Sequence, residues 1–314
     1  MPSKIEWTDN TWNPVTGCTK VSQGCKHCYA EREWIRLSAN PKTVQFGRCF
    51  TDVQCHPSRL DKPLHWRKPR RVFVNSMSDL FHVDVPTQFI DEVFAVMALC
   101  TQHTFQILTK RPERMLRYLA YTDPKARIDA VINENRFDKY CRRDGWVEGM
   151  DRFIGQWPLK NVALGISAED QPTFNRRILP LMETPAAIRW ISIEPMLGLI
   201  DLHFGFFLDD VLWRRRHHGH CLDKPMIDWV VVGGESGPKA RPMHPDWARS
   251  VRDQCVSVEV PFHFKQWGEW APRDVAMQIY GKDYDPNNDV EMARVGKKKS
   301  GRELDGRTWN ECPA

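Results

Sequence analysis

Short apolar runs rich in β-branched and aromatic residues alternate with helix-like stretches along this chain, and this alternation limits its possible folds more than any other feature. The helix-like stretches cover 91–100, 112–119 and 245–256. We predict strands at six runs: 72–75, 104–108, 162–166, 187–193, 229–232 and 260–264. Strands separated by helices indicate βαβ units and a parallel sheet. Such units around one core predict an α/β fold, a full or partial (β/α) barrel with parallel strands.

Compact polar residues follow each predicted strand. They include Ser76, Ser78, Asp79, Lys110, Arg111, Ser167, Glu169, Glu194, Gly233, Gly234, Glu235 and Lys265. Parallel α/β folds bind ligands at the carboxyl ends of their strands, so these residues are candidates for one common polar pocket. A simpler interpretation is that strands end in loops and loops are polar. Repetition after six strands, with carboxylates after four of them, favours the shared pocket.

Three cysteines lie close together near the start of the chain: Cys18, Cys25 and Cys28. Three thiolates are one short of the four that close an iron–sulfur cluster, and a [4Fe–4S] cube held this way keeps one iron free for S-adenosylmethionine (SAM). Gly17 and Gly24 permit the tight backbone that converging sulfurs require. Two other interpretations stay open: a zinc site with His27 or a distant residue as fourth ligand, and ordinary buried thiols. No second Cys-x-x-Cys follows to complete a typical zinc site.

The composition bounds the class of protein. The chain has 314 residues, of which 41% are hydrophobic, which suffices for one large domain or two small ones. No apolar run typical of a signal peptide or a membrane span occurs. Ten cysteines without a signal indicate a reducing, cytoplasmic location and metal or redox use rather than disulfides. We expect most of the other seven cysteines to be small core residues.

The net charge of +5 is concentrated in three basic clusters, at 67–71, 214–218 and 297–299. Such clusters can bind phosphates, although each one alone is more often a solvated surface. Within and after the second cluster, His217, His218, His220 and Cys221 also permit a zinc interpretation, but an exposed basic insertion is the simpler one. The thirteen tryptophans can stack on bases, while core packing explains most of them.

Two polar segments interrupt the strand and helix pattern. We predict a barrel domain over 1–268 with excursions near 124–160 and 201–226. A tail over 269–314, rich in Gly, Lys, Asp and Asn, is expected to pack weakly and to cover or flank the barrel.

Several motifs in combination resemble one family. They are Thr11–Cys18 with the spaced Cys25 and Cys28, and the segments 74–82, 108–111, 192–195, 232–238, 295–298 and 304–309. Together they resemble the phage Gp37/Gp68 family, whose members carry a three-cysteine motif. That family is similar to radical SAM proteins, with enzymes of the spore photoproduct lyase type as the closest analogy.

The resemblance implies roles for individual residues. His27 stands where radical SAM proteins place an aromatic residue beside the cofactor. Ser76, Ser78 and Asp79 stand where the SAM amino group is bound, and Ser167 and Glu169 where the ribose is met. Gly233 and Gly234 allow close approach of a ligand to the backbone, and we include them among the cofactor-binding candidates.

The chain departs from the usual radical SAM pattern in two ways. Six residues separate Cys18 from Cys25, where three are common. The Gly-Gly-Glu motif usually follows the second strand, but here 233–235 comes much later, so we assign Glu235 to the substrate. Glu235, Lys110 and Glu194 are the candidate catalytic residues at the strand ends.

These observations predict a cytoplasmic radical SAM-like enzyme. It would cleave SAM reductively at a three-cysteine [4Fe–4S] cluster with an electron donor as partner, and the basic clusters and phage resemblance favour a nucleic acid or nucleotide substrate. The alternative is a zinc-stabilised nucleic-acid-binding protein without radical chemistry.

Overall fold

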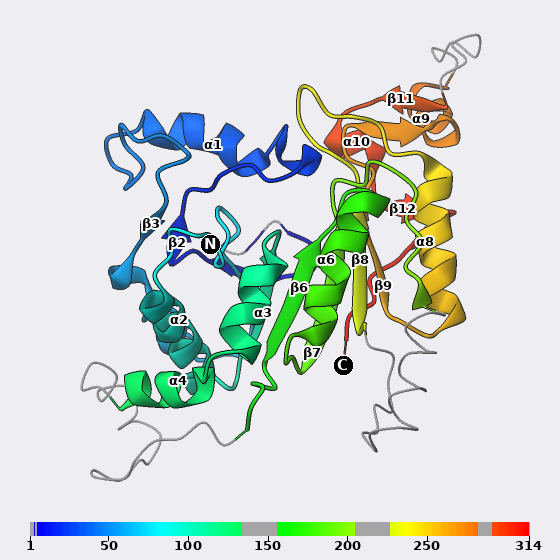
Figure 1. The fold of residues 1–314 in the computed structure, drawn as a ribbon. Coiled ribbons are helices and arrows are strands. Elements are labelled where there is room, and N and C mark those ends of the chain that lie inside the picture. Colours follow the sequence, from blue (N-terminus) through cyan, green and yellow to red (C-terminus); the bar gives the residue numbers. More distant parts are fainter. Residues whose placement is uncertain (1–2, 4, 134–155, 205–226, 282–290, 314) are drawn as a thin grey trace, which may run out of the picture. The chain divides into compact units, whose positions relative to one another are not determined.

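The computed structural model describes residues 3, 5–133, 156–204, 227–281 and 291–313. Seven strands form one sheet in the order β1-β4-β5-β6-β7-β8-β9, and the pairings described within it are parallel (Figure 1). They are Asn10–Trp12 (β1), Arg71–Val74 (β4), Thr104–Thr109 (β5), Val162–Ser167 (β6), Ile188–Ile193 (β7), Trp229–Gly233 (β8) and Phe262–Gln266 (β9). Neighbouring strands follow one another in chain order, as in a partial (β/α) barrel, so the predicted α/β fold class is confirmed.

All six predicted strands coincide with strands of the sheet, and β1 is the additional one. Its three residues are too few for a periodic pattern, and only Trp12 among them is buried. The Trp12 indole also donates to the Arg59 carbonyl at 2.7 Å, a contact that sequence periodicity does not indicate.

The chain divides into two compact units. The first comprises residues 1–19, 30–166 and 179–188, and the second comprises 20–29, 167–178 and 189–314. Strands β1, β4 and β5 and nearly all of β6 belong to the first unit, while β7 from Arg189 onward, β8 and β9 belong to the second.

Helices of the first unit pack on a largely apolar core. They are Tyr29–Ser38 (α1, all but its first residue), Thr87–Leu99 (α2), Pro112–Ala120 (α3) and Pro124–Ile132 (α4), and a short antiparallel pair joins Val15–Thr16 (β2) to Gln54–Cys55 (β3). Helix α3 starts at Pro112, whose fixed φ suits the first helical turn. Helices α2 and α4 lie side by side (Figure 1). Asp91 on α2 accepts hydrogen bonds from Arg127 on α4 and from Tyr118 on α3.

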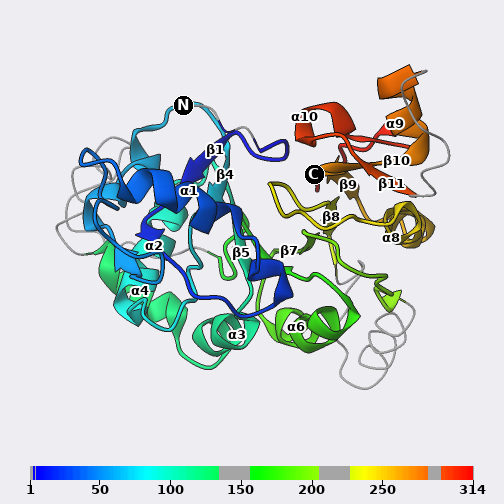
Figure 2. The same ribbon diagram turned by 90° about the horizontal axis from the view of Figure 1, so that it is seen from above.

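In the second unit, β8 is buried on both faces, which is why its sequence is a continuous apolar run rather than an alternating one. Its described helices are Pro245–Ser257 (α8), Arg273–Tyr280 (α9) and Lys297–Ser300 (α10), and the first part of Gln171–Glu183 (α6) also belongs to it. Figure 2 shows α9 and α10 beside the antiparallel pair Trp270–Pro272 (β10) and Met292–Arg294 (β11).

The C-terminal segment is tied to the edge strand β9 and its neighbours. It contains the short pair Glu303–Leu304 (β12) and Arg307–Thr308 (β13). The Phe264 amide donates to the Trp309 carbonyl at 3.1 Å, and the Trp267 indole donates to the Glu303 carbonyl at 2.9 Å. The first bond satisfies an amide that the edge strand otherwise leaves unpaired, and the second ties the residue after β9 to the C-terminal segment. The boundary at residue 268 stays a prediction.

Of the other seven cysteines, which we expect to be mostly small core residues, five lie within the described residues. Cys100 and Cys255 are buried, but Cys55 is half-buried and Cys49 and Cys312 are exposed. Burial raises the pKa of the Cys55 thiol to about 11, and Glu92 adds to the shift. Cys141, the basic cluster at 214–218, His220 and Cys221 lie outside the described residues. None of the described helices is long and apolar enough to cross a membrane.

Candidate metal and cofactor site

Cys18 lies in the first unit, just after β2, and is half-buried and in no disulfide. Its amide donates to the Phe50 carbonyl at 2.9 Å, which fixes the backbone at this point. Gly17 before it has a φ of 87°, and a Cβ there would crowd the Asp52 and Phe50 carbonyls. The predicted need for glycine at position 17 is therefore met by backbone conformation and space together.

Asp79 and Arg111 form an ion pair beside Cys18. Arg111 Nη1 lies 3.0 Å from Asp79 Oδ2 and 3.6 Å from Cys18 Sγ. The Arg111 side chain is 14% exposed and the Asp79 side chain 7% exposed, so water screens the pair weakly. Burial alone lowers the pKa of Arg111, but Asp79 and Cys18 outweigh it and the pKa is raised. The guanidinium therefore stays charged.

The Asp79 carboxylate has four donors within the chain. Oδ1 accepts from the Phe81 amide at 2.9 Å and the Thr109 hydroxyl at 2.8 Å. Oδ2 accepts from the Lys110 amide at 3.1 Å and from Arg111. A carboxylate offers about four lone-pair positions, so these bonds leave none for an external amine. The assignment of Asp79 to the SAM amino group stays a prediction that this geometry does not support.

Ser76 and Ser78 bond to the loop around β2. The Ser76 hydroxyl donates to Asn13 Oδ1 at 3.1 Å, and the Ser78 hydroxyl donates to the Val15 carbonyl at 2.8 Å. Asn75, which our sequence analysis did not select, makes the turn with a φ of 60° and accepts from the Val15 amide at 3.2 Å. Asparagine tolerates this left-handed conformation better than most residues, which is the signal that identifies it.

Cys25 and Cys28 belong to the second unit and are also half-buried and in no disulfide. Cys25 ends a short 3-10 helix, Gln23–Cys25, and Cys28 directly precedes α1. The Ser22 carbonyl accepts from the Cys25 amide at 3.0 Å, and the Ser22 hydroxyl lies 3.8 Å from Cys25 Sγ.

Glu169 anchors this part of the segment from a fully buried position. It follows β6 and accepts from the Ser22 hydroxyl at 2.9 Å and from Arg177 Nη1 at 3.1 Å. A Cβ on Gly24 would overlap the Glu169 side chain, so glycine is required there by space alone. Glu169 therefore supports the cysteine segment, and its predicted contact with a ribose is untested.

Arg177, the partner of Glu169, was missed by sequence reasoning. Its side chain is 1% exposed and also donates to the Ser167 carbonyl at 2.6 Å. The available signal is its position in α6, where it falls on the apolar face with Phe174 and Ile178. A charged residue on an apolar helix face requires a buried partner.

Glu194 and Lys265 meet at the ends of β7 and β9. Lys265 Nζ lies 2.7 and 2.9 Å from the two Glu194 oxygens, and the Gln266 amide lies 3.4 Å from one of them. Gly233, at the end of β8 between these strands, has its hypothetical Cβ 3.3 Å from the Glu194 carboxylate. The prediction that charged residues converge at the strand ends is met for this pair.

Glu235 is held by both branches of the Arg241 guanidinium, with Nη2 2.6 Å from Oε1 and Nε 2.9 Å from Oε2. Burial raises the pKa of Glu235, but the hydrogen bonds and charge of Arg241 and the charge of His27 outweigh this and lower it. Arg241 also donates to the carbonyl of Gln23, two residues before Cys25, at 3.0 Å. A Cβ on Gly234 would overlap the Trp267 carbonyl, so this glycine serves close backbone packing.

The roles of Lys110, His27, Gly233 and Gly234 toward a cofactor or substrate stay predictions. The backbone amide of Lys110 donates a hydrogen bond to Asp79. His27 is half-buried, and its charge contributes to the lowered pKa of Glu235. Lys110 and Arg111 lie in the first unit and Glu194, Glu235 and Lys265 in the second.

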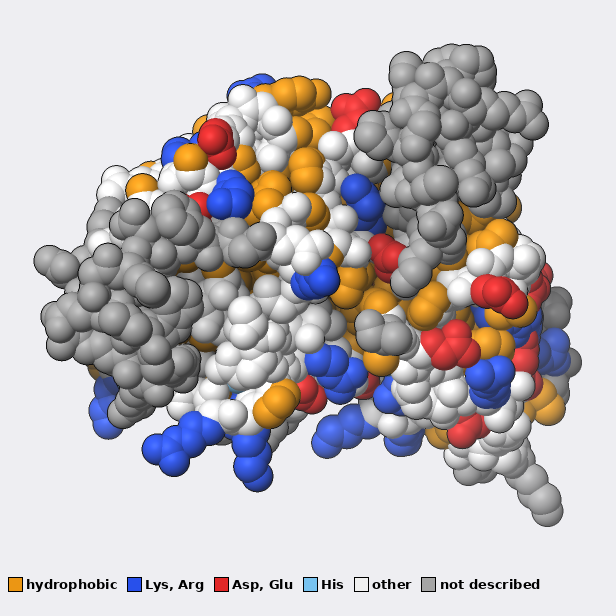
Figure 3. Space-filling view, turned by 90° about the horizontal axis from the view of Figure 1, so that it is seen from below, with side chains coloured by type: hydrophobic (Ala, Val, Ile, Leu, Met, Phe, Trp, Pro, Cys, Tyr) orange, Lys and Arg blue, Asp and Glu red, His pale blue; other side chains and the backbone are white. Residues whose placement is uncertain are grey.

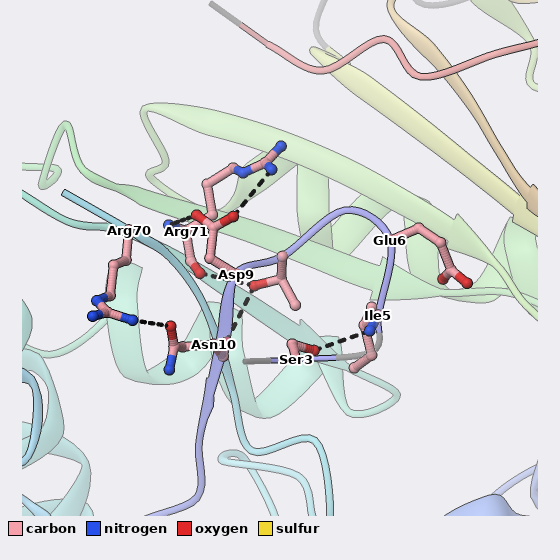
Figure 4. Close-up of a pocket in the computed structure, with 8 residues that line it drawn as sticks. Ser3, Ile5, Glu6, Asp9, Asn10, Arg70 and Arg71 are labelled. Carbon is pink, nitrogen blue, oxygen red and sulfur yellow. Dashed lines mark hydrogen bonds and ion pairs between the residues drawn. The ribbon is translucent and has the colours of Figure 1, made fainter. Parts of the chain in front are cut away.

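A separate pocket lies at the amino ends of β1 and β4, opposite the strand ends that carry Asp79 and Arg111 (Figure 4). Its polar side chains are mutually bonded: Arg71 pairs with Asp9, and Arg70 donates to Asn10 at 2.6 Å. None of the predicted site residues lines it. Its position therefore does not mark the candidate site.

Comparison with known proteins gives a family and a distant likeness of fold. Residues 2–313 match the family described as "Protein of unknown function (DUF5131)". No curated protein matches the sequence. The phage Gp37/Gp68 assignment stays a prediction.

Three solved structures of spore photoproduct lyase are similar at 12% identity. A mutant has a TM-score of 0.38 over 74% of this chain. A complex with dinucleoside spore photoproduct has a TM-score of 0.36 over 78% of this chain, and a mutant with bound AdoMet and the same compound has a TM-score of 0.35 over 79% of this chain. This chain spans 59%, 60% and 61% of their lengths. Such a likeness concerns the fold and not the chemistry.

Proposed function

The chain belongs to the DUF5131 family, and we propose that it is a radical SAM-like enzyme in which Cys18, Cys25 and Cys28 hold a [4Fe–4S] cluster. A cluster bound there supplies the electron for reductive cleavage of SAM. The observation that carries the proposal is how the cysteine segment is anchored. Arg111, which follows β5, bonds at Cys18, and Glu169, which follows β6, bonds at Ser22. Ligands of parallel α/β folds bind at these carboxyl ends of strands.

The donor set suits this group. All three cysteines are half-buried and in no disulfide, whereas Cys100 and Cys255 are closed inside the core. Soft thiolates are the usual ligands of iron–sulfur clusters. The charged Arg111 guanidinium stabilises negative charge on the sulfur of Cys18.

The charged pairs of the second unit supply polar groups for a substrate. Glu194 with Lys265 and Glu235 with Arg241 are each paired within the chain, so they carry charge without an unpaired buried ion. We propose that Glu194, Glu235 and Lys110 contact the substrate, and that Ser167 and Glu169 lie near the cofactor. His27 would flank the cofactor from its place before Cys28.

A nucleic acid or nucleotide is the proposed substrate class, with an electron donor as partner and a cytoplasmic location. Support comes from the basic residues at 67–71 and 297–299. Lys and Arg side chains on the face in Figure 3 are interspersed with Asp and Glu rather than gathered in one patch. Phosphate contacts would therefore act through dispersed charges, and binding would weaken with added salt.

Single replacement of Cys18, Cys25 or Cys28 by Ala tests the proposal. We expect each variant to lose iron loading, because two thiolates do not hold the cube against loss. Cys100→Ala and Cys255→Ala are the controls and should load iron as the parent does. Iron and sulfide per chain, measured after anaerobic reconstitution, decide the result. Equal iron in all five variants overturns the assignment.

Zinc analysis of the same samples tests the alternative. Colourless protein with stoichiometric zinc that depends on the three cysteines would favour a zinc-stabilised nucleic-acid-binding protein. Within the described residues, His244, Asp246 and Glu291 are another group whose ligand atoms lie within 4.8 Å of one another. A His244→Ala variant measures zinc bound at that surface group and allows it to be subtracted.

A further inference from the structure

One guanidinium holds two consecutive residues of the cysteine segment. Arg111 Nη1 donates to Cys18 Sγ at 3.6 Å. Its Nη2 donates to the Thr19 carbonyl at 2.9 Å and to the Thr19 hydroxyl at 3.0 Å. The planar fork of arginine makes such divergent contacts with fixed geometry, which a lysine ammonium does not reproduce.

The guanidinium is itself held in place. Asp79 Oδ2 accepts from Nη1 at 3.0 Å, and Asp79 Oδ1 accepts from the Thr109 hydroxyl, to which the Arg111 amide donates at 2.9 Å. Side chain and backbone of Arg111 are therefore tied to the same carboxylate. Their low exposure keeps the charge near Cys18 poorly screened.

The far side of Thr19 is fixed by a buried histidine. His82 is 1% exposed, and its Nδ1 accepts from the Asp84 amide at 3.2 Å. This bond assigns the ring proton to Nε2, which lies 2.8 Å from the Thr19 hydroxyl and donates to it. Thr19 is thus bonded from two sides, by His82 and by Arg111.

We infer that Arg111 is the positioning residue for Cys18 and that its charge raises the reduction potential of the cluster bound through that sulfur. The inference rests on the proposed function. Hydrogen bonds and positive charge at a ligand sulfur stabilise the reduced, more negative state of a cluster. Asp79 serves by holding Arg111 rather than by meeting the cofactor.

Redox titration of reconstituted protein, followed by electron paramagnetic resonance, tests the inference. Arg111→Gln should load less iron than the parent and shift the midpoint potential to more negative values, and Arg111→Lys should shift it less. Arg127→Gln is the matched control, because Arg127 pairs with the buried Asp91 and stacks on Tyr118 in the same unit. It should lower the melting temperature without moving the potential.

If Arg111→Gln has the same iron content and the same midpoint potential as the parent, the inference is overturned while the proposed function stands. Failure of the parent to bind any iron–sulfur cluster overturns both. Loss of iron with a folded circular dichroism spectrum in Arg111→Gln, when Arg127→Gln still loads, supports the positioning role. If Arg111→Gln does not fold, Arg111→Lys decides, and parent iron and potential in that variant overturn the inference.

Discussion

The start and the middle of the cysteine segment are anchored by different physical means. At Cys18, a partly exposed ion pair bonds the sulfur itself through Arg111. Near Cys25, a fully buried pair of Glu169 and Arg177 holds Ser22 and presses against Gly24, one residue before the thiol. The first anchor bonds the sulfur of Cys18, and the second fixes the path of the backbone.

This difference indicates how each anchor should respond to substitution. A buried ion pair that loses one partner leaves an uncompensated charge in the core, so the second anchor should govern stability. The Arg111 and Asp79 side chains are 14% and 7% exposed, against 1% and 0% for Arg177 and Glu169, so loss of the pair at Cys18 should cost less stability and be felt more in metal binding. The following predictions test this division.

Glu169→Gln should have the largest effect on stability. It leaves Arg177 charged and buried beside a neutral amide, at a cost of about 3–5 kcal/mol in the free energy of unfolding. Denaturant unfolding measures this loss when the slope of the free energy of unfolding against denaturant concentration is the same in parent and variant. Asp79→Asn is the comparison at the first anchor and should cost less. A larger loss in Asp79→Asn would reverse the division of roles.

Gly24→Ala should destabilise next, by about 1–3 kcal/mol, because the methyl group overlaps the buried Glu169 side chain. Metal content should fall as the backbone before Cys25 shifts. Gly198→Ala is the control, since its Cβ would lie 3.7 Å from Asp170 Cβ in ordinary contact. Equal melting temperatures for the two variants would show that the backbone around Gly24 shifts to fit the methyl group without loss of stability.

Glu235→Gln separates a structural brace from a substrate contact. As a brace held by the two-branched bond from Arg241, Glu235 would contribute about 1.5 kcal/mol of stability, which the variant loses while it retains its cluster content. Thermal unfolding of the reconstituted protein measures the loss. An unchanged melting temperature, together with loss of substrate-dependent turnover, would instead assign Glu235 to the substrate.

The smallest of the predicted effects is on stability in mild acid, which should affect the first unit more than the second. Burial, with Arg59, Arg48 and Lys62, lowers the pKa of His56 to about 4, and its Nε2 lies 2.7 Å from the Thr16 hydroxyl. The unfolded chain binds this proton near pH 6.5 and the folded chain only near pH 4, so stability falls as pH drops through that window. The lowered pKa of Glu235 acts in the same direction but at lower pH: its contribution is present above the unfolded value of 4.5 and is lost as pH falls below it.

Urea midpoints measured from pH 7 to pH 5 check this difference. The slope with pH should be reduced in His56→Gln and unchanged in Glu235→Gln. If the urea midpoint of His56→Gln changes with pH as steeply as that of the parent, other groups govern the acid sensitivity of the first unit.

Local features of the molecule could be predicted from the sequence alone. Apolar runs such as 229–232 identify their strands because buried parallel strands are continuously hydrophobic. Gly17 and Gly24 were recognised beside the cysteines, and Glu194 and Lys265 were placed at strand ends that meet. Strand β1 went unrecognised because its three residues carry little periodic signal. Helix α1 was also missed, although its buried Ala30 and Trp34 have the four-residue spacing of one helix face.

Only the tertiary structure decided which charges are partners. Asp79 with Arg111, Glu169 with Arg177 and Glu235 with Arg241 form pairs that the sequence does not distinguish from other combinations of carboxylates and arginines. An ion pair depends on distances of a few ångströms between side chains, and these follow from strand register and helix packing rather than from spacing along the chain. The sequence therefore determined which chemistry is present at the strand ends, and the fold determined what each group holds.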